Sequence, residues 1–248
     1  MKVKLFNIEI DALSMRQTLD IVEDAVANDK HIHHTVVNAG KIVLMQEDKE
    51  LEKSVNEADL INADGQAVVW ASKMLGSPLP ERVSGIDLME KLVKRSFEKG
   101  YRCYFLGAEE DVVSNLITLY KKKYSNNVIA GYRNGYFKKS DEKRIAKDIS
   151  QSNANILFVA ITSPKKEIFL NTYKKELKNI NFIMGVGGSF DVIAGKVNRA
   201  PKWMQGIGFE WLYRVMQEPR RMFMRYLVGN TKFIYLVLKE FFLLNRKV

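Results

Sequence analysis

The chain has 248 residues, of which 46% are hydrophobic and 27% charged, and its net charge is +10. This length permits one large or two small domains with a buried core, and the composition excludes a disordered or low-complexity chain. Cys103 is the single cysteine, so an internal disulfide and a CxxC metal site are excluded and a reducing compartment is expected. The N-terminus lacks the apolar stretch of a signal peptide, which indicates a cytoplasmic protein.

Strand-like and helix-like segments alternate along the first 190 residues. The apolar strand-like runs lie at 35–38, 60–63, 103–106, 128–131, 156–161 and 182–186. Helical periodicity appears between them, at 13–27, 39–56, 65–75, 86–98, 110–124, 140–151 and 165–177. Several runs, such as Ile156–Ile161, are apolar at every position, as strands buried on both faces of a parallel sheet require. The pattern predicts an α/β fold with a doubly wound, Rossmann-like parallel sheet flanked by helices.

Glycines follow two of the predicted strands, where ligands of such sheets bind. Gly185, Gly187 and Gly188 form a turn that precedes a predicted helix. Such a turn lets the backbone approach a phosphate, and helix N-terminal N–H groups bind anions, but a tight structural turn is the alternative. Gly107 gives a weaker signal of the same kind. Neither GxGxxG nor a Walker sequence is present, which disfavours a Rossmann-type dehydrogenase.

Asp64 directly follows the strand-like run 60–63 and precedes Gly65. A carboxylate at that edge of the sheet is suited to act as a general base. Aspartate is also a favoured N-cap residue, so capping of the next helix is the alternative. The sequence leaves both roles open.

The three histidines, His31, His33 and His34, are neighbours. A strand would place His31 and His33 on one face, which permits metal binding, but no carboxylate or cysteine partner is evident. We therefore expect a polar loop here, and neither a metal nor another cofactor. Because Asp-x-Asp is also absent, a diphosphate ligand would need arginines or helix N-termini to neutralise it.

Most of the positive charge lies in residues 196–248, which contain eleven basic and three acidic residues and so account for +8 of the +10. This segment also has apolar runs at 222–228 and 233–244, but Lys232, Lys239 and Glu240 argue against a membrane-spanning helix. An amphipathic helix on an anionic membrane surface and a helix packed on the core are both compatible with this pattern. Nucleic acid is disfavoured because no nucleic-acid-binding motif accompanies the charge.

Arginines are grouped within this basic segment. Pro219 predicts a break between two helices and would be the first residue of the second. Arg221 and Arg225 are four residues apart and so share a helix face, and Arg214 lies on the preceding helix. Such a cluster suits a lipid-linked diphosphate; ordinary solvated arginines are the alternative. We predict a core over 1–195 and a basic, amphipathic helical appendage over 196–248.

Characteristic blocks of residues occur in order over almost the whole chain: NADGQ (62–66), GSPLPERVSG (76–85), YFLGA (104–108), GYRNGYF (131–137), SPKKE (163–167), GVGGSFD (185–191), RAPKWM (199–204), EWLYR (210–214), EPRR (218–221) and RY (225–226). In these blocks the chain resembles the WecG/TagA/CpsF glycosyltransferases of bacterial cell-envelope synthesis.

The resemblance implies an inverting, metal-independent transfer from a UDP-sugar to a polyprenyl-diphosphate-linked sugar at the cytoplasmic membrane face. In its teichoic-acid branch the donor is UDP-N-acetylmannosamine and the acceptor is GlcNAc-diphospho-undecaprenol. The implied base is Asp64. The donor-binding residues are then predicted to be Asn38, Arg82 and Lys166, from the family's motifs, together with the glycines that follow the predicted strands, Gly107, Gly185, Gly187 and Gly188. Arg214, Arg221 and Arg225 would hold the acceptor diphosphate, and a homo-oligomer is compatible with the family.

Two positions depart from the family pattern. The family has a threonine two residues before Asn38, where this chain has Val36, with Thr35 one place earlier. On a strand this shift moves the hydroxyl to the opposite face unless a bulge corrects it. Lys166 replaces a glutamine, and an ammonium only donates hydrogen bonds whereas an amide also accepts them. A hexose or uronic-acid donor is thus an alternative, as is a non-catalytic membrane-surface adaptor.

Overall fold

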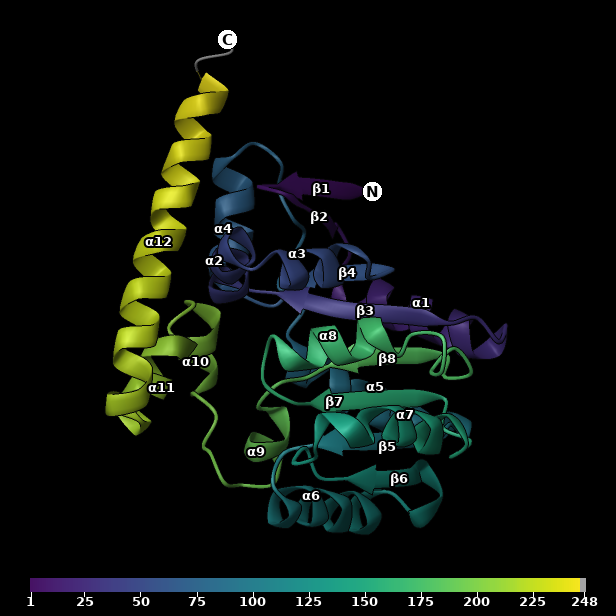
Figure 1. The fold of residues 1–248 in the computed structure, drawn as a ribbon. Helices are drawn as coiled ribbons and strands as arrows, with labels where there is room; N and C mark the ends of the chain where they lie inside the picture. Colours follow the sequence, from purple (N-terminus) through teal and green to yellow (C-terminus); the bar gives the residue numbers. More distant parts are fainter. Residues whose placement is uncertain (246–248) are drawn as a thin grey trace.

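A six-stranded, wholly parallel sheet forms the centre of the molecule (Figure 1). The computed structural model describes residues 1–245, except for the side chains of Arg221 and Asn245. The strand order is β4-β3-β8-β7-β5-β6. The strands are β3 (Ile32–Val37), β4 (Leu60–Ala63), β5 (Cys103–Gly107), β6 (Ile129–Arg133), β7 (Ile156–Ala160) and β8 (Phe182–Gly185). The predicted α/β fold with a parallel sheet is confirmed, and all six carboxyl ends meet at one edge.

Helices cover both faces of the sheet. They are α1 (Met15–Ala27), α2 (Ala39–Glu47), α3 (Lys49–Asn56), α4 (Gln66–Met74), α5 (Gly85–Lys99), α6 (Glu110–Lys123), α7 (Glu142–Ser150) and α8 (Lys165–Thr172). Successive β5 side chains enter opposite cores, because side chains alternate along a strand. Cys103 and Phe105 pack with α5 and α6, whereas Tyr104 and Leu106 pack with α7 and α8. Burial on both faces explains why these strands are apolar throughout.

The structure differs from the sequence prediction in the segment 39–56, where two helices replace the one predicted. Asp48 ends α2 and begins α3, and its carboxylate accepts hydrogen bonds from the N–H groups of Glu50 and Leu51, each at 3.0 Å. An aspartate in this position stabilises a new helix start, so a continuous helical periodicity hides the break.

A two-stranded antiparallel hairpin, β1 (Lys2–Leu5) and β2 (Ile8–Asp11), was not predicted. Its burial alternates, and its inner residues join the core beside β4. Asp11 fixes the hairpin to β4 by accepting the Ile61 N–H at 2.9 Å. The apolar–polar alternation of the first eleven residues is the signal that could have identified it.

The prediction that the histidines lie in a polar loop is wrong for two of them. His33 and His34 are buried on β3, while His31 precedes the strand. His34 stacks on Phe182, and its Nε2 lies 2.9 Å from Oδ1 of Asn62. The imidazole is therefore accommodated inside the core because one ring nitrogen has a polar partner and the ring face an aromatic one.

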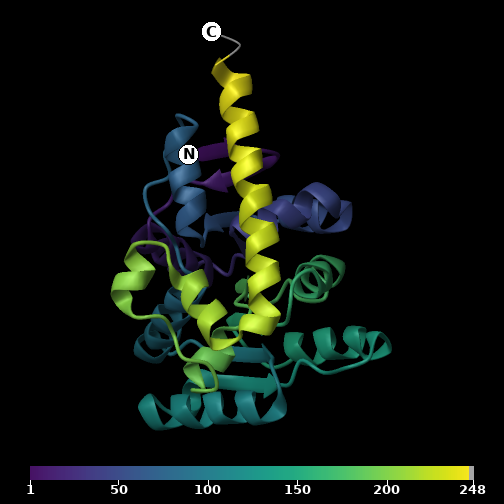
Figure 2. The same ribbon diagram turned by 90° about the vertical axis from the view of Figure 1, so that its left-hand side faces the viewer.

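Four helices follow β8: α9 (Ser189–Ile193), α10 (Lys202–Gly206), α11 (Glu210–Gln217) and α12 (Pro219–Asn245). Pro219 begins α12, as predicted. At about 1.5 Å per residue, α12 is roughly 40 Å long. In Figure 1, β3 and β7 point toward the side on which α10, α11 and α12 stand. Figure 2 shows α12 running along that side, with α10 and α11 at its lower end. We use the term appendage for residues 196–245.

The appendage is attached to the core by apolar and ionic contacts. Phe233 and Val237 of α12 are buried in the core cluster that includes α2, and the Phe233 ring meets Phe6 edge-on at 5.9 Å. The two terminal nitrogens of Arg199 donate to the Asp87 carboxylate at 2.6 and 2.7 Å. One face of α12 thus packs on the core, as one of the two interpretations of the basic tail predicts.

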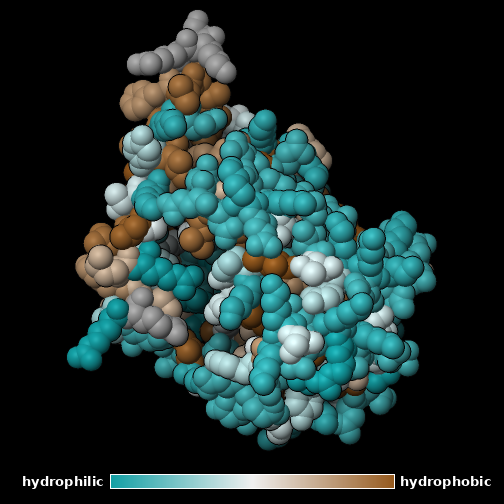
Figure 3. All heavy atoms as spheres, viewed as in Figure 1, coloured by the Kyte–Doolittle hydropathy of each residue, from teal (hydrophilic) through white to brown (hydrophobic). Residues whose placement is uncertain are grey.

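Many large apolar side chains of the appendage are nevertheless exposed. On α12 they include Phe223, Met224, Leu227, Ile234, Tyr235 and Phe242. In Figure 3 brown side chains gather along α12, whereas most of the visible body is teal. No helix among the described residues is long and apolar enough to cross a bilayer.

Candidate active site

Asp64 lies at the carboxyl edge of the sheet, directly after β4. Its N–H donates to the carbonyl of Val37 at 2.9 Å, and its Oδ1 accepts the N–H of Gly85, the first residue of α5, at 3.2 Å. Gly65, and not Asp64, is the N-cap residue of α4. The helix-capping alternative is therefore wrong, and the Asp64 carboxylate is available for chemistry.

Burial raises the pKa of Asp64 above its usual value. The charges of Arg82 and Arg214 and the Gly85 hydrogen bond oppose this increase, whereas Glu210 adds to it. The Asp64 side chain keeps 27% of its surface exposed, so a substrate has access to it. A recessed carboxylate with a raised pKa is a better proton acceptor than a solvated one.

Arg82 links Asp64 to the appendage. Its Nε donates to the Asp64 carbonyl at 2.6 Å, and its Nη2 donates to Oε2 of Glu210, on α11, at 2.7 Å. The same Nη2 is 3.9 Å from Oδ1 of Asp64. Asn38 lies next to Gly65, the residue after Asp64, since a Cβ built on Gly65 would be 3.2 Å from the Asn38 Cβ. The structure thus brings Asn38, Asp64 and Arg82 together at the ends of β3 and β4.

A buried ion cluster lies near the same edge. The Nζ atoms of Lys41 and Lys166 are each 2.7 Å from Oε1 of Glu167, and Lys41 Nζ also donates to Thr35 Oγ1 at 3.3 Å. Burial and the charge of Lys41 lower the pKa of Lys166 to about 8. Burial would raise the pKa of Glu167, but the two lysines outweigh it and lower this pKa to about 2. With both lysines charged, the cluster has an excess of one positive charge.

Thr35 and Val36, which form the first departure from the family pattern, face opposite sides of β3. Its register against β4 is regular, so the bulge that would correct the position of the hydroxyl is not present. Thr35 faces the ion cluster, whereas Val36 faces α5, where its Cγ2 would be 3.9 Å from a Cβ on Gly85. An apolar side chain therefore stands on the Asp64 side of the strand.

Gly107 and Gly185 are the last residues of β5 and β8, and packing explains both of them, whereas Gly187 and Gly188 lie in the turn after β8. A Cβ on Gly107, whose φ is +134°, would collide with the carbonyl of Ala160. A Cβ on Gly185 would lie 2.7 Å from Cε of Lys166, so this glycine leaves room for the lysine. Gly187 has a φ of +53°, which favours glycine, and Gly188 is the N-cap residue of α9. Packing alone therefore explains why positions 107 and 185 are glycines.

The appendage arginines approach the site from α11 and α12. The charge of Arg214 acts on Asp64, and that of Arg225 acts on Lys166, lowering the pKa in each case. Arg225 is exposed and Arg214 partly exposed. The side chain of Arg221 lies outside the part of the chain that the structure describes.

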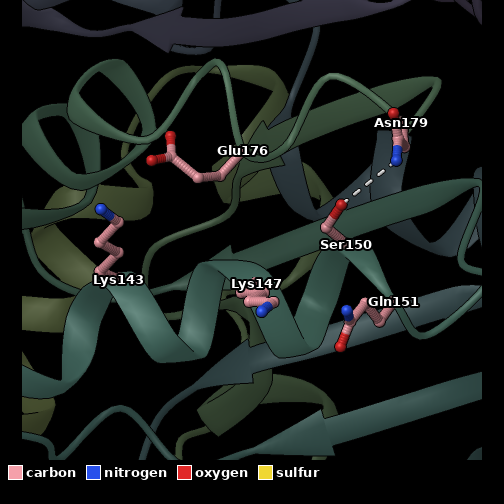
Figure 4. A pocket seen from close by; sticks show the side chains of 6 residues that line it. All are labelled: Lys143, Lys147, Ser150, Gln151, Glu176 and Asn179. Carbon is pink, nitrogen blue, oxygen red and sulfur yellow. Dashed lines mark hydrogen bonds between the residues drawn. The ribbon is translucent and has the colours of Figure 1, made fainter.

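A hollow of about 320 Å³ lies elsewhere, between α7 and the segment after α8 (Figure 4). It is lined by Lys143, Lys147, Ser150, Gln151, Glu176 and Asn179, and none of the predicted site residues contributes to it. Among the described residues, no group of three or more His, Cys, Asp or Glu side chains is placed to hold a metal ion. The predicted site residues lie instead at the carboxyl edge of the sheet, which is the candidate active site.

A match to a known protein family covers nearly the whole chain. Residues 3–247 match the glycosyl transferase WecG/TagA/CpsF family. The chain belongs to this family. It is therefore a glycosyltransferase, and the dehydrogenase and non-catalytic adaptor alternatives are set aside.

Two relatives are both named N-acetylglucosaminyldiphosphoundecaprenol N-acetyl-beta-D-mannosaminyltransferase. The protein from Bacillus spizizenii is 35% identical over 189 residues, which cover 76% of this chain and 72% of the relative. The protein from Bacillus subtilis is 33% identical over 193 residues, which cover 78% and 73%. The resemblance inferred from the sequence blocks is thus confirmed.

Three charged residues of the candidate site were not predicted from the sequence. Glu210 and Glu167 lie within the blocks EWLYR and SPKKE, but nothing in the sequence identifies their partners. Lys41 is an ordinary-looking helical lysine until the structure shows that it is buried against Glu167. The only signal that could have identified Lys41 as buried is its position in a helical segment with few other charged residues.

Proposed function

We propose that this glycosyltransferase moves N-acetylmannosamine from UDP-N-acetylmannosamine to GlcNAc-diphospho-undecaprenol, with inversion and without a metal. The observation that carries the proposal is the Asp64 carboxylate, recessed at the carboxyl edge of the sheet with a raised pKa and not used as the N-cap of α4. The names of the two relatives support the choice of donor and acceptor.

In this mechanism the acceptor hydroxyl oxygen attacks the anomeric carbon, while its proton passes to the Asp64 carboxylate. The bond between the anomeric carbon and the UDP oxygen breaks, and UDP leaves with the electron pair. Positive groups around the diphosphate stabilise the charge that develops on UDP. We assign donor binding to the residues already placed at this edge: Asn38, Arg82, Gly107, Lys166, Gly185, Gly187 and Gly188.

We assign the acceptor diphosphate to the appendage, through Arg214, Arg221 and Arg225. We further propose that the exposed apolar side chains of α12 lie on the anionic cytoplasmic leaflet of the membrane, which makes this a peripheral cytoplasmic enzyme. Sedimentation with vesicles tests this. The protein should pellet with phosphatidylglycerol vesicles but not with phosphatidylcholine vesicles at low salt, and equal pelleting with both would contradict the role of the basic residues.

A donor with an acidic sugar is a second candidate, and the buried ion cluster favours it. Lys41, Lys166 and Glu167 together have an excess positive charge, whereas the family pattern has a neutral glutamine at position 166. A buried positive charge is stabilised by a negative one, such as the carboxylate of an acidic sugar. An assay with UDP-N-acetylmannosamine and the corresponding UDP-uronic acid decides between them. If the acidic donor is the substrate, K166Q should reverse the preference.

The central experiment combines UDP-N-acetylmannosamine with a synthetic GlcNAc-diphospho-prenyl acceptor and measures product mass and turnover. Because general-base assistance contributes about 10²–10⁴-fold, D64N should reduce turnover by about that factor while UDP still binds. Asp20 is exposed on α1, so D20N is the matched control and should retain wild-type turnover. Near-wild-type turnover by D64N would remove Asp64 from the role of base.

A further inference from the structure

Arg82 stands between two carboxylates, and its contacts with them differ. The terminal nitrogen Nη2 is 2.7 Å from Oε2 of Glu210 but 3.9 Å from Oδ1 of Asp64. The first distance is that of a charge-assisted hydrogen bond, and the second is too long for one. Arg82 and Glu210 are also the less exposed partners, at 16% and 18% against 27% for Asp64. Nη2 of Arg82 is therefore paired with the appendage carboxylate, while Nε stays bonded to the backbone carbonyl of Asp64.

The fold fixes Glu210 in this position. Gly208, two residues earlier, has a φ of +70°, and a Cβ there would lie 2.9 Å from the Trp70 ring and 3.2 Å from the Cβ of Gln66. Trp70 and Gln66 belong to α4, the helix that begins just after Asp64. Glu210 is the first residue of α11, where the helix N-terminus favours its negative charge. Glycine at position 208 thus lets α11 close onto the helix next to the proposed base.

We propose that Glu210 is a positioning residue for the transfer reaction, because it holds the Arg82 guanidinium on the appendage side and keeps Asp64 free to accept the acceptor proton. This inference rests on the proposed function, in which Asp64 is the base. Without Glu210, Nη2 of Arg82 is released to form a direct ion pair with Asp64. A carboxylate in such a pair is a weaker base.

The other charged groups around Asp64 do not replace Glu210. Arg214, on α11, adds a second positive charge, and Gly85 of α5 offers its N–H. Asp87, also on α5, is occupied by a bidentate pair with Arg199. Glu210 is thus the group that engages Arg82 from the appendage, and undocking of α11 would weaken the base. Proton transfer is thereby coupled to the docking of the segment proposed to bind the acceptor.

The test is the pH dependence of kcat/KM, measured with UDP-N-acetylmannosamine and a water-soluble, short-chain GlcNAc-diphospho-prenyl acceptor. In the wild type the acidic limb reports protonation of Asp64. In E210Q this limb should move to lower pH by about one unit or more, as expected for a carboxylate that gains an arginine partner. The value of kcat/KM on the plateau above this limb should fall by at most about tenfold for each pH unit by which the limb moves.

Three further variants make the result decisive. E240Q removes an acidic residue from the far part of α12 and should leave the limb in place. R82Q/E210Q should show a smaller downward movement relative to R82Q than E210Q shows relative to the wild type, because the guanidinium that captures Asp64 is gone and only the direct charge effect of Glu210 on Asp64 is lost. E210D keeps the charge and should return the acidic limb toward the wild-type position. This rescue also keeps the test valid if E210Q folds poorly.

Three outcomes are distinguishable. A uniform loss of activity in E210Q at every pH, with the limb unmoved, would give Glu210 only a structural role and overturn the inference. An equal shift in the R82Q background would also overturn it. If the wild type transfers no sugar, or if D64N keeps the acidic limb, the proposed function itself fails.

Discussion

The core and the appendage contain similar apolar side chains but place them differently. In the core, Phe105, Phe158, Phe182 and Phe190 are fully buried in one cluster, where Phe105 packs against both Phe158 and Phe190. In the appendage, Phe233 and Val237 are buried, whereas Phe223, Ile234 and Phe242 are more than half exposed. The core closes around its own side chains, but the appendage presents apolar surface that only an external phase or partner can cover. The predictions below test this difference.

The largest expected effect is on the stability of the core. Phe158 is completely buried between β5, β8 and their neighbours, so F158A should lower the free energy of unfolding by about 3–5 kcal/mol. The matched change in the appendage is F223A, which removes a ring that is 53% exposed. F223A should change the free energy of unfolding by less than about 0.5 kcal/mol. Urea titration measures both. Equal losses would show that the appendage is as tightly packed as the core.

The arginines of the appendage should affect acceptor binding and leave the core unchanged. A lost hydrogen bond to a charged group costs about 1.5–3 kcal/mol, so R214Q and R225Q should each raise the acceptor KM by roughly ten- to a hundredfold. Lys239 is exposed on the same helix as Arg225, and K239Q is the control. Initial rates at varied acceptor concentration provide the measurement. An unchanged acceptor KM in both variants would remove these arginines from the acceptor site.

Acid should destabilise the core through its buried histidines. Burial lowers the pKa of His33 to about 4 and of His34 to about 3, from 6.5. Below pH 6.5 the unfolded chain therefore takes up protons that the folded chain does not. The free energy of unfolding should fall by about 1.4 kcal/mol per pH unit for each histidine, or about 2 kcal/mol each at pH 5.

Urea titrations at pH 7 and pH 5 test this expectation. In H34Q the difference between the two pH values should shrink by about the contribution of one histidine, roughly 2 kcal/mol. The pKa of Glu167 is lowered to about 2, so protonation of this residue reduces stability only below pH 4.5. The interval from pH 7 to pH 5 therefore reports mainly on the histidines. An unchanged pH dependence in H34Q would show that His34 is protonated inside the fold.

The smallest effect is expected at the outer edge of the docked helix. Lys232 pairs with Glu47 of α2, but both side chains are about half exposed, so K232A should cost no more than about 1 kcal/mol. The neighbouring F233A removes the buried ring that meets Phe6 and should release α12. Limited proteolysis compares the two variants. Equal cleavage of α12 in both would mean that the ion pair, and not the apolar contact, holds the helix.

Local patterns predicted the elements of the sheet because their causes are local. The fully apolar run 156–161 follows from burial on both faces, and Pro219 begins a helix wherever its surroundings permit one. The break at Asp48 was missed because helical periodicity continues through it. The burial of His33 and His34 was missed because their polar identity favours a loop, and a specific partner, Asn62, makes the core position possible for His34.

By itself, the sequence determined the α/β class, the concentration of charge in the last 53 residues, the candidate base Asp64 and, through its ordered blocks, the family. Only the tertiary structure decided which charges meet. Arg82 and Glu210 are 128 positions apart, and Lys41 and Glu167 lie on different helices. Such pairs exist because the parallel sheet brings its strand ends to one edge and the appendage docks there. Local sequence periodicity cannot predict this docking, because the contacts that stabilise it join surfaces that become neighbours only in the folded chain.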